Sequence, residues 1–190
     1  IGNFRAYIFE DLLRRFLEAK DYNVFHIMNI TDIDDKTIRR SIEDNLSLSE
    51  FTNLYTDAFH EDVKALNILP AHNYPRATEF IDQMIDIIKQ LESKGYTYIT
   101  ADGSVFFKIS KFKEYGKLAN LNPDQLKVGE RVEQDEYGKE EGRDFALWKG
   151  HKKEDGDVFW DSPWGKGRPG WHIECSAMSM HYLGEHFDIH

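Results

Sequence analysis

The stretch NVFHIMNI, residues 23–30, decides the fold class together with the segment directly before it. Because the stretch is mostly apolar, it indicates a buried strand of the kind found in parallel sheets. Residues 4–20 predict an amphipathic helix, since apolar side chains recur there at three- and four-residue spacing: Phe4, Ile8, Leu12, Leu13, Phe16 and Leu17. A helix that leads into a buried strand is half of an α/β unit, so the sequence predicts an α/β fold.

Helices are expected to continue as scaffold at residues 36–45, 48–67 and 75–94. Ser47 is followed three residues later by Glu50, which is the spacing of a capping box at the start of the second of these helices. Gly95 is the residue type that ends a helix in the left-handed conformation, so it marks the end of the third.

Residues 96–165 are predicted to form an insertion of short strands and loops between two pieces of the α/β core. A hairpin is expected at its start, with strands at residues 96–100 and 105–109 joined across Asp102-Gly103. The chain then becomes charged and loses its periodicity, apart from a short apolar island, FALW, at residues 145–148. A helix at residues 171–183 and a strand that opens at residues 187–190 are expected to return to the core.

Composition limits the class of protein. The chain has 190 residues and 41% hydrophobic content, which is enough for a real core, and no apolar run approaches the roughly 20 residues of a membrane span. A single cysteine excludes an internal disulfide and fits a reducing compartment. The net charge of −10 argues against a chain that wraps nucleic acid over its whole surface, while a local contact stays possible. We expect a soluble, cytoplasmic protein with no membrane partner.

The only cysteine lies in GWHIECSAM, residues 170–178, directly after the loop SPWGKGRPG at residues 162–170. A free cysteine is most often a small buried hydrophobe. Here Pro169-Gly170 leads into a helix whose first turns contain Cys175, and the helix dipole there favours the thiolate. A core residue, a catalytic nucleophile and a soft metal ligand are therefore all open interpretations. His172, three residues earlier, can share a metal with Cys175, but one thiol does not complete a zinc site.

A second polar segment, NITDIDDK at residues 29–36, lies where the predicted strand turns into a helix. Ligands of open α/β sheets bind at this position. The three carboxylates of Asp32, Asp34 and Asp35 can hold Mg²⁺. Alternatively, Asp34 or Asp35 caps the following helix and Asp32 pairs with a nearby Lys or Arg. Thr31 and Asp32 are the stronger candidates for a ligand contact.

Several segments, taken together and in order, closely resemble the cysteinyl-tRNA synthetase family: IGN at 1–3, NITDIDDK at 29–36, DFALWK at 144–149, SPWG at 162–165, GWHIECSAM at 170–178 and FDIH at 187–190. The resemblance implies a Rossmann-like class I synthetase catalytic core with an inserted connective subdomain, truncated at both ends. Residues 1–95 would be the first part of the core with a helical segment, residues 96–165 the insertion, and residues 166–190 the return to the core.

The resemblance also implies an ATP site. The family's HIGH motif would begin one residue before this chain, so Ile1, Gly2 and Asn3 match its last three positions, with asparagine in place of histidine. In such enzymes the motif binds ATP and stabilises the charge that develops on the phosphates, which makes Asn3 the expected catalytic residue. Asparagine donates a hydrogen bond but carries no positive charge. Without the resemblance, Gly2 and Asn3 at a helix start fit phosphate binding, but a glycine there more often only allows the turn into the helix.

By the same resemblance Cys175 is a zinc ligand, and Thr31, Trp171 and His190 line the cysteine pocket. Zinc held by soft and borderline ligands can take the substrate thiolate, so serine, with its hard hydroxyl, is rejected without editing. The other zinc ligands and most of the ATP site are expected outside residues 1–190. Little or no activity is therefore expected from the isolated chain.

The implied reaction has two steps. Cysteine and ATP, the latter with Mg²⁺, give cysteinyl adenylate, and the acyl group then moves to the terminal ribose of tRNA(Cys). The expected partners are thus cysteine, ATP and tRNA(Cys), and a monomer is expected. One alternative is a cysteine ligase of the same fold that passes the activated cysteine to an amino sugar, as in mycothiol synthesis. Another is a homologous binding protein that lost the chemistry. The asparagine at position 3 favours it, whereas the presence of Trp171, Cys175 and His190 together argues against it.

Overall fold

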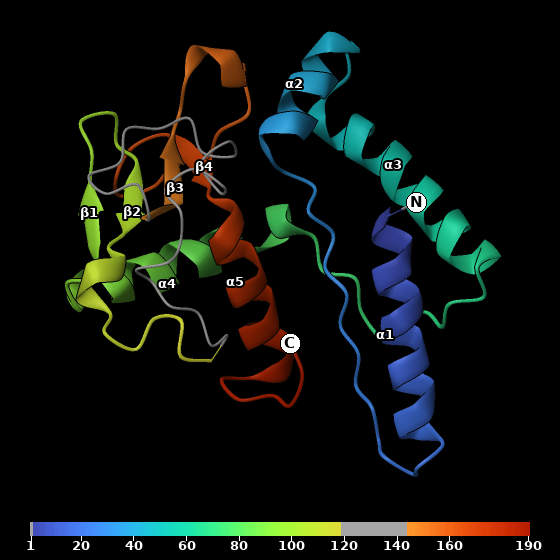
Figure 1. Cartoon of the computed structure of the whole chain (residues 1–190). Helices are drawn as coiled ribbons and strands as arrows, with labels where there is room; N and C mark the ends of the chain where they lie inside the picture. The colour runs from blue at the N-terminus through green and yellow to red at the C-terminus, as the bar shows by residue number, and fades with distance from the viewer. Residues whose placement is uncertain (1, 119–143) are drawn as a thin grey trace. The chain divides into compact units, whose positions relative to one another are not determined.

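The computed structural model describes residues 2–118 and 144–190 (Figure 1). The chain divides into two compact units, Ile1–Glu79 and Phe80–His190. The described residues combine helices with one four-stranded sheet, so the predicted α/β class is confirmed. No helix among the described residues is both long enough and apolar enough to cross a membrane.

The first unit contains the helices α1 (Gly2–Glu18), α2 (Asp35–Glu43) and α3 (Leu48–Ala65), close to the predicted ranges. The predicted capping box of α3 is confirmed, because Ser47 and Glu50 each accept a hydrogen bond from the other's backbone N–H. A second capping box, between Asp34 and Thr37, opens α2. Both helix starts are thus fixed by side chains within three residues of the cap.

Residues 23–30 are extended but do not form the predicted strand. Only Met28 is fully buried, and the segment pairs in parallel with residues 72–77 at just two isolated positions within the described residues. The Met28 N–H donates to the Asn73 carbonyl. The next bond of a regular parallel ladder needs a donor at Pro75, which has no backbone N–H. The parallel direction is therefore confirmed, and the proline explains why the ladder is interrupted.

The second unit begins with a helix that starts later than predicted. Residues Ala77–Phe80 form a 3-10 turn, and the α-helix α4 spans Ile81–Ser93. Gly95 follows with a φ of +74°, which confirms the left-handed end expected there.

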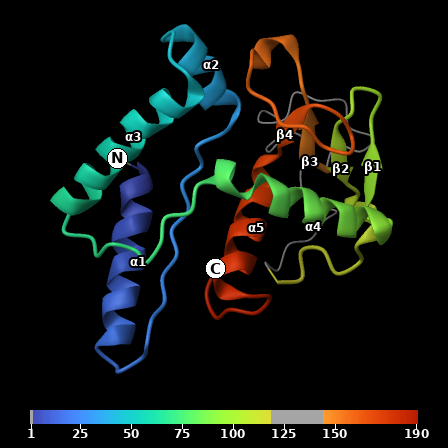
Figure 2. The same ribbon diagram turned by 180° about the vertical axis from the view of Figure 1, so that it is seen from behind.

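The sheet of the second unit has the order β1-β2-β3-β4 and is antiparallel throughout. The predicted hairpin is confirmed as β1 (Thr97–Ile99) paired with β2 (Val105–Phe107). The apolar island is β3 (Phe145–Gly150), and its other neighbour is β4 (Gly167–Pro169). The helix α5 (Trp171–Leu183) follows β4 directly, as predicted. Contacts join α4 to β1 and α5, and α5 to β3, and Figure 2 shows this packing from behind.

Residues 187–190 do not form the predicted strand. The segment after α5 is irregular, and the Phe187 ring contacts the His190 ring at 5.8 Å between centroids. A strand needs a partner for its backbone groups, and no described strand pairs with this segment.

Two glycines allow β4 and the start of α5 to lie against β3. A Cβ on Gly170 would lie 2.0 Å from the Ala146 carbonyl oxygen, and one on Gly167 would lie 2.3 Å from the Lys149 carbonyl oxygen. Both neighbours are backbone atoms of a buried strand, so they cannot move aside as a side chain can. The approach of α5 to the sheet therefore requires glycine at both positions.

We predict that Gly170→Ala destabilises the second unit by about 3 kcal/mol, because the added methyl group overlaps backbone. Gly95→Ala is the matched control. Its Cβ meets no atom within 4 Å. It should cost only about 1 kcal/mol, from the left-handed backbone alone. All four tryptophans lie in the second unit, so urea unfolding followed by tryptophan fluorescence reports on that unit. Equal losses for the two variants would contradict the overlap.

Candidate functional site

The candidate site is built on the junction between β4 and α5. Gly170 is the N-cap of α5 and provides no side-chain cap. Its backbone N–H instead donates to the Leu147 carbonyl of β3, at 2.9 Å. The first residue of the helix, Trp171, is 54% exposed, and its ring lies 5.3 Å from the ring of His172. The junction thus presents an accessible indole from a backbone that is hydrogen-bonded to a buried strand.

Cys175 is the fifth residue of α5 and is half-buried. Burial raises the pKa of its thiol, the neighbouring carboxylate of Glu174 raises it further, and a backbone hydrogen bond partly opposes both. The preference for the thiolate that was predicted from the helix dipole is therefore outweighed by burial and by the charge of Glu174. The dipole acts within the first turn, which Cys175 lies beyond, and the buried Glu174 carboxylate disfavours a second negative charge beside it.

The chemistry of Cys175 suits a metal ligand better than a free nucleophile. A thiol with a raised pKa is mostly protonated at neutral pH, whereas a coordinated thiol is deprotonated by the cation. Among residues 2–118 and 144–190, no three His, Cys, Asp or Glu side chains gather as a metal site. Cys175 therefore fits zinc as one ligand, and the described residues do not complete the site.

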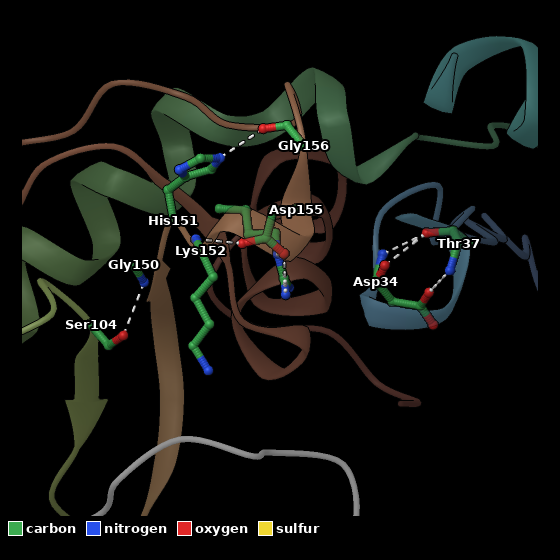
Figure 3. A network of polar contacts seen from close by, with 9 residues as sticks. Asp34, Thr37, Ser104, Gly150, His151, Lys152, Asp155 and Gly156 are labelled. Atoms are coloured by element: carbon green, nitrogen blue, oxygen red, sulfur yellow. Dashed lines mark hydrogen bonds and ion pairs between the residues drawn. The ribbon is translucent and has the colours of Figure 1, made fainter. Parts of the chain in front are cut away.

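The aspartates of residues 29–36 do not form a magnesium site, which was one of the two interpretations of this segment. Asp34 caps α2 and accepts from the Thr37 N–H (Figure 3), which confirms the capping alternative. Asp32 is 3% exposed and accepts from both the N–H and the hydroxyl of Thr78, at 3.0 and 2.6 Å. The expected pairing of Asp32 with Lys or Arg was therefore wrong. Hydrogen bonds within the protein engage both carboxylates, which leaves Thr31 as the ligand candidate of this segment.

The remaining predicted site residues are spread over both units. Gly2 and Asn3 lie in the first turn of α1, as expected for residues at a helix start, while Ile1 lies outside the described residues. Thr31 is half-buried in the first unit and accepts from the Asn29 side-chain amide at 3.3 Å. His190 is exposed in the second unit.

Within the second unit the structure brings two predicted residues together. Trp171 and Cys175 are four residues apart on α5, so they lie one turn from each other on the same side of the helix.

A buried ion pair next to this site was missed by sequence reasoning. Arg168, in β4, lies 3.2 Å from Asp155, and their side chains are only 5% and 9% exposed. The carboxylate of Asp155 also accepts from the Lys152 N–H, a contact drawn in Figure 3. No periodic spacing links residues 155 and 168, and charged residues in a polar loop normally indicate solvent exposure. Only the three-dimensional contact identifies this pair.

Comparison with known proteins defines the class. Over residues 1–190 the chain matches the family described as "tRNA synthetases class I (C) catalytic domain", and it belongs to this family. Its relatives include the cysteine–tRNA ligase of Brachyspira hyodysenteriae, which is 59% identical over 192 residues. Those of Chlamydia caviae and Protochlamydia amoebophila are 54% and 52% identical. The resemblance to cysteinyl-tRNA synthetases is therefore confirmed. Each match covers 100% of this chain and 40% of the relative, so the chain spans about 40% of their length.

We predict that the Cys175 thiol of the metal-free protein reacts more slowly with iodoacetamide at pH 7 than the same thiol in the urea-unfolded chain. The thiolate is the attacking form, and a raised pKa lowers its population at neutral pH. The rate should rise with pH through an apparent pKa above the ordinary value. Glu174→Gln should move that pKa downward and speed the reaction, because it removes the adjacent negative charge. Identical pH profiles for folded and unfolded protein would contradict this account.

Proposed function

We propose that this chain is part of the catalytic domain of a cysteine–tRNA ligase that activates cysteine with ATP and transfers it to tRNA(Cys). The observation that carries the proposal is the junction of β4 and α5. There a chain of this family presents an accessible indole at Trp171 and a half-buried thiol at Cys175, one turn apart. An aromatic surface beside a soft metal ligand suits a small thiol substrate.

The proposed ATP contacts are Ile1, Gly2 and Asn3. Gly2 and Asn3 belong to the first turn of α1, where free N–H groups and the helix dipole favour phosphate. Asn3 would act as the catalytic residue by donating a hydrogen bond to the phosphates as charge develops. Because asparagine adds no positive charge, Mg²⁺ bound with ATP and residues elsewhere in the polypeptide would carry more of the neutralisation.

The proposed cysteine contacts are Trp171, Thr31 and His190. The indole of Trp171 would provide the apolar surface, while the Thr31 hydroxyl and the His190 ring would supply polar contacts that orient the substrate. Cys175 would be one zinc ligand in this chain, with the other ligands outside it. Zinc, when bound, would give the substrate thiolate a soft partner that the hydroxyl of serine cannot match.

The remaining parts of the proposal concern organisation. We assign residues 1–95 to the first part of a Rossmann-like core, residues 96–165 to an inserted connective subdomain and residues 166–190 to the return to that core. The polypeptide would act in the cytoplasm as a monomer. The competing activity is transfer of the activated cysteine to an amino sugar. The names of the relatives support tRNA as the acceptor.

The test is cysteine-dependent exchange of pyrophosphate into ATP by the natural polypeptide that contains this chain. We expect exchange with cysteine at least about a hundredfold above exchange with serine, because the selective contact is to the thiol. A zinc chelator should abolish the exchange. Charging assays with tRNA(Cys) and with an amino sugar then separate the two acceptors. A folded, zinc-loaded protein that shows no exchange would contradict the proposal and support a binding protein.

We also expect Cys175→Ser to remove zinc and exchange together, since a hydroxyl is a poor zinc ligand. Ser176→Ala is the matched control. Ser176 is the next residue of α5 and is exposed, so its loss should leave zinc content and exchange unchanged. Zinc content measured by atomic absorption on both variants gives a readout that does not depend on activity. Full zinc content in Cys175→Ser would contradict the assignment.

A further inference from the structure

The start of α5 is placed by a very short strand. β4 has three residues, Gly167, Arg168 and Pro169, and pairs with β3 from Gly150 to Trp148. All three residues of β4 are buried. A strand of this length has few ladder hydrogen bonds of its own, so additional contacts must hold its position along β3.

The side chain of Arg168 provides such a contact. Its Nε and Nη2 atoms both donate to the Oδ1 atom of Asp155, at 3.3 and 3.2 Å. The Oδ2 atom of Asp155 accepts from the Lys152 N–H at 2.9 Å. One carboxylate oxygen of Asp155 therefore binds β4, and the other binds the backbone of the turn that contains Asp155. Because the side chains of both Arg168 and Asp155 are almost fully buried, a shift of either would separate two opposite charges in the interior.

The ion pair spans the loop between β3 and β4. Asp155 ends a 3-10 turn, Lys153–Asp155, near the beginning of this loop. At its far end Gly167 exchanges two backbone hydrogen bonds with Trp160, at 2.7 and 3.0 Å. The side chain of Arg168 therefore binds β4 to this loop. The backbone of the neighbouring residue, Gly167, binds β4 to the same loop.

The connection from Arg168 to Trp171 is stiff. It consists of Pro169, whose ring fixes φ, and Gly170, whose α-carbon lies against the Ala146 carbonyl with no room for a Cβ. The Gly170 N–H is also held by the Leu147 carbonyl. A displacement of Arg168 along β3 must therefore move the first turn of α5.

We propose that Arg168 and Asp155 form a positioning pair that sets the register of β4 against β3 and, through it, the place of the Trp171 indole that contacts cysteine. The cysteine contact rests on the proposed function, whereas the effect on the start of α5 does not. Neither residue touches the substrate in this account. Their effect is on the affinity for cysteine, with little effect on ATP.

If the pair only stabilised the fold, the cysteine KM would recover together with Tm once both charges were removed. The reason is that a buried ion pair contributes little net stability. Replacing both charges by neutral groups is often neutral or stabilising, whereas removing one charge also removes the attraction that offsets the cost of burying the other. The double variant Asp155→Asn with Arg168→Met removes both charges and keeps a side-chain oxygen for the Lys152 N–H. The double variant therefore separates an effect on the stability of the protein from an effect on the position of β4.

The experiment uses the natural polypeptide that contains this chain, with the variants D155N, R168K and the double variant D155N/R168M. D155N should lower Tm and raise KM for cysteine by about tenfold or more, since misplacement by ~1 Å can cost as much as a hundredfold. The double variant should recover the Tm and keep the raised KM. R168K retains the charge without the planar fork and should give an intermediate KM, with Tm close to that of the unchanged protein. KM for ATP should stay within about twofold throughout, because the affected contact is to cysteine.

The matched control is Asp86→Asn. Asp86 forms an ion pair of 3.2 Å with Lys89 on α4, in the same unit, but the two side chains are 68% and 49% exposed. Loss of an exposed pair should change neither Tm nor either KM measurably.

Hydrogen exchange at the Gly170 amide provides a readout that does not need activity. In D155N and in the double variant this amide should exchange about tenfold faster than in the unchanged protein, because the β4 register is loosened. A cysteine KM that recovers together with Tm in the double variant, or an unchanged Gly170 exchange rate, would overturn the positioning role. Faster Gly170 exchange in a protein that shows no cysteine-dependent activity at all would leave the positioning of α5 standing and instead contradict the proposed function.

Discussion

The contact between the Gly170 α-carbon and the Ala146 carbonyl is the constraint on which the second unit depends. It lets α5 begin directly against β3, an inner strand of the sheet, with 2.0 Å between that carbonyl oxygen and any added Cβ. From this point the direction of α5 follows, and with it the exposed indole of Trp171 and the half-buried thiol of Cys175. A loop of ordinary residues could not approach a buried backbone so closely.

Buried charge is the second feature of this unit. Burial of the thiol raises the pKa of Cys175, and the carboxylate of Glu174, which is 1% exposed, raises it further, so both favour the neutral thiol. A cation at this position would reverse the preference, because it stabilises both the thiolate and the carboxylate nearby. The ion pair of Arg168 and Asp155 lies at the other end of the same junction. The junction therefore combines a backbone held against β3 with buried charges on either side of it.

Local patterns predicted the helices well, since amphipathic spacing and capping residues act within a few positions of the chain. They failed where structure depends on a distant partner. Residues 23–30 have the composition of a buried strand, yet Pro75, far along the chain, removes the donor that a continuous ladder needs. The apolar island at residues 145–148 was predicted as an interruption of a charged insertion, and it belongs to a largely buried inner strand of the sheet, between β2 and β4.

The sequence by itself determined the α/β class, the hairpin, the capping box of α3 and the membership of a synthetase family, because each depends on residue types at short, fixed spacings. Tertiary structure alone decided the raised pKa of Cys175, the engagement of Asp32 by Thr78 and the pairing of Arg168 with Asp155. These properties depend on burial and on neighbours far away in the chain. A pKa or an ion pair is set by the local dielectric and by the distance between charges, and neither can be read from the order of residues.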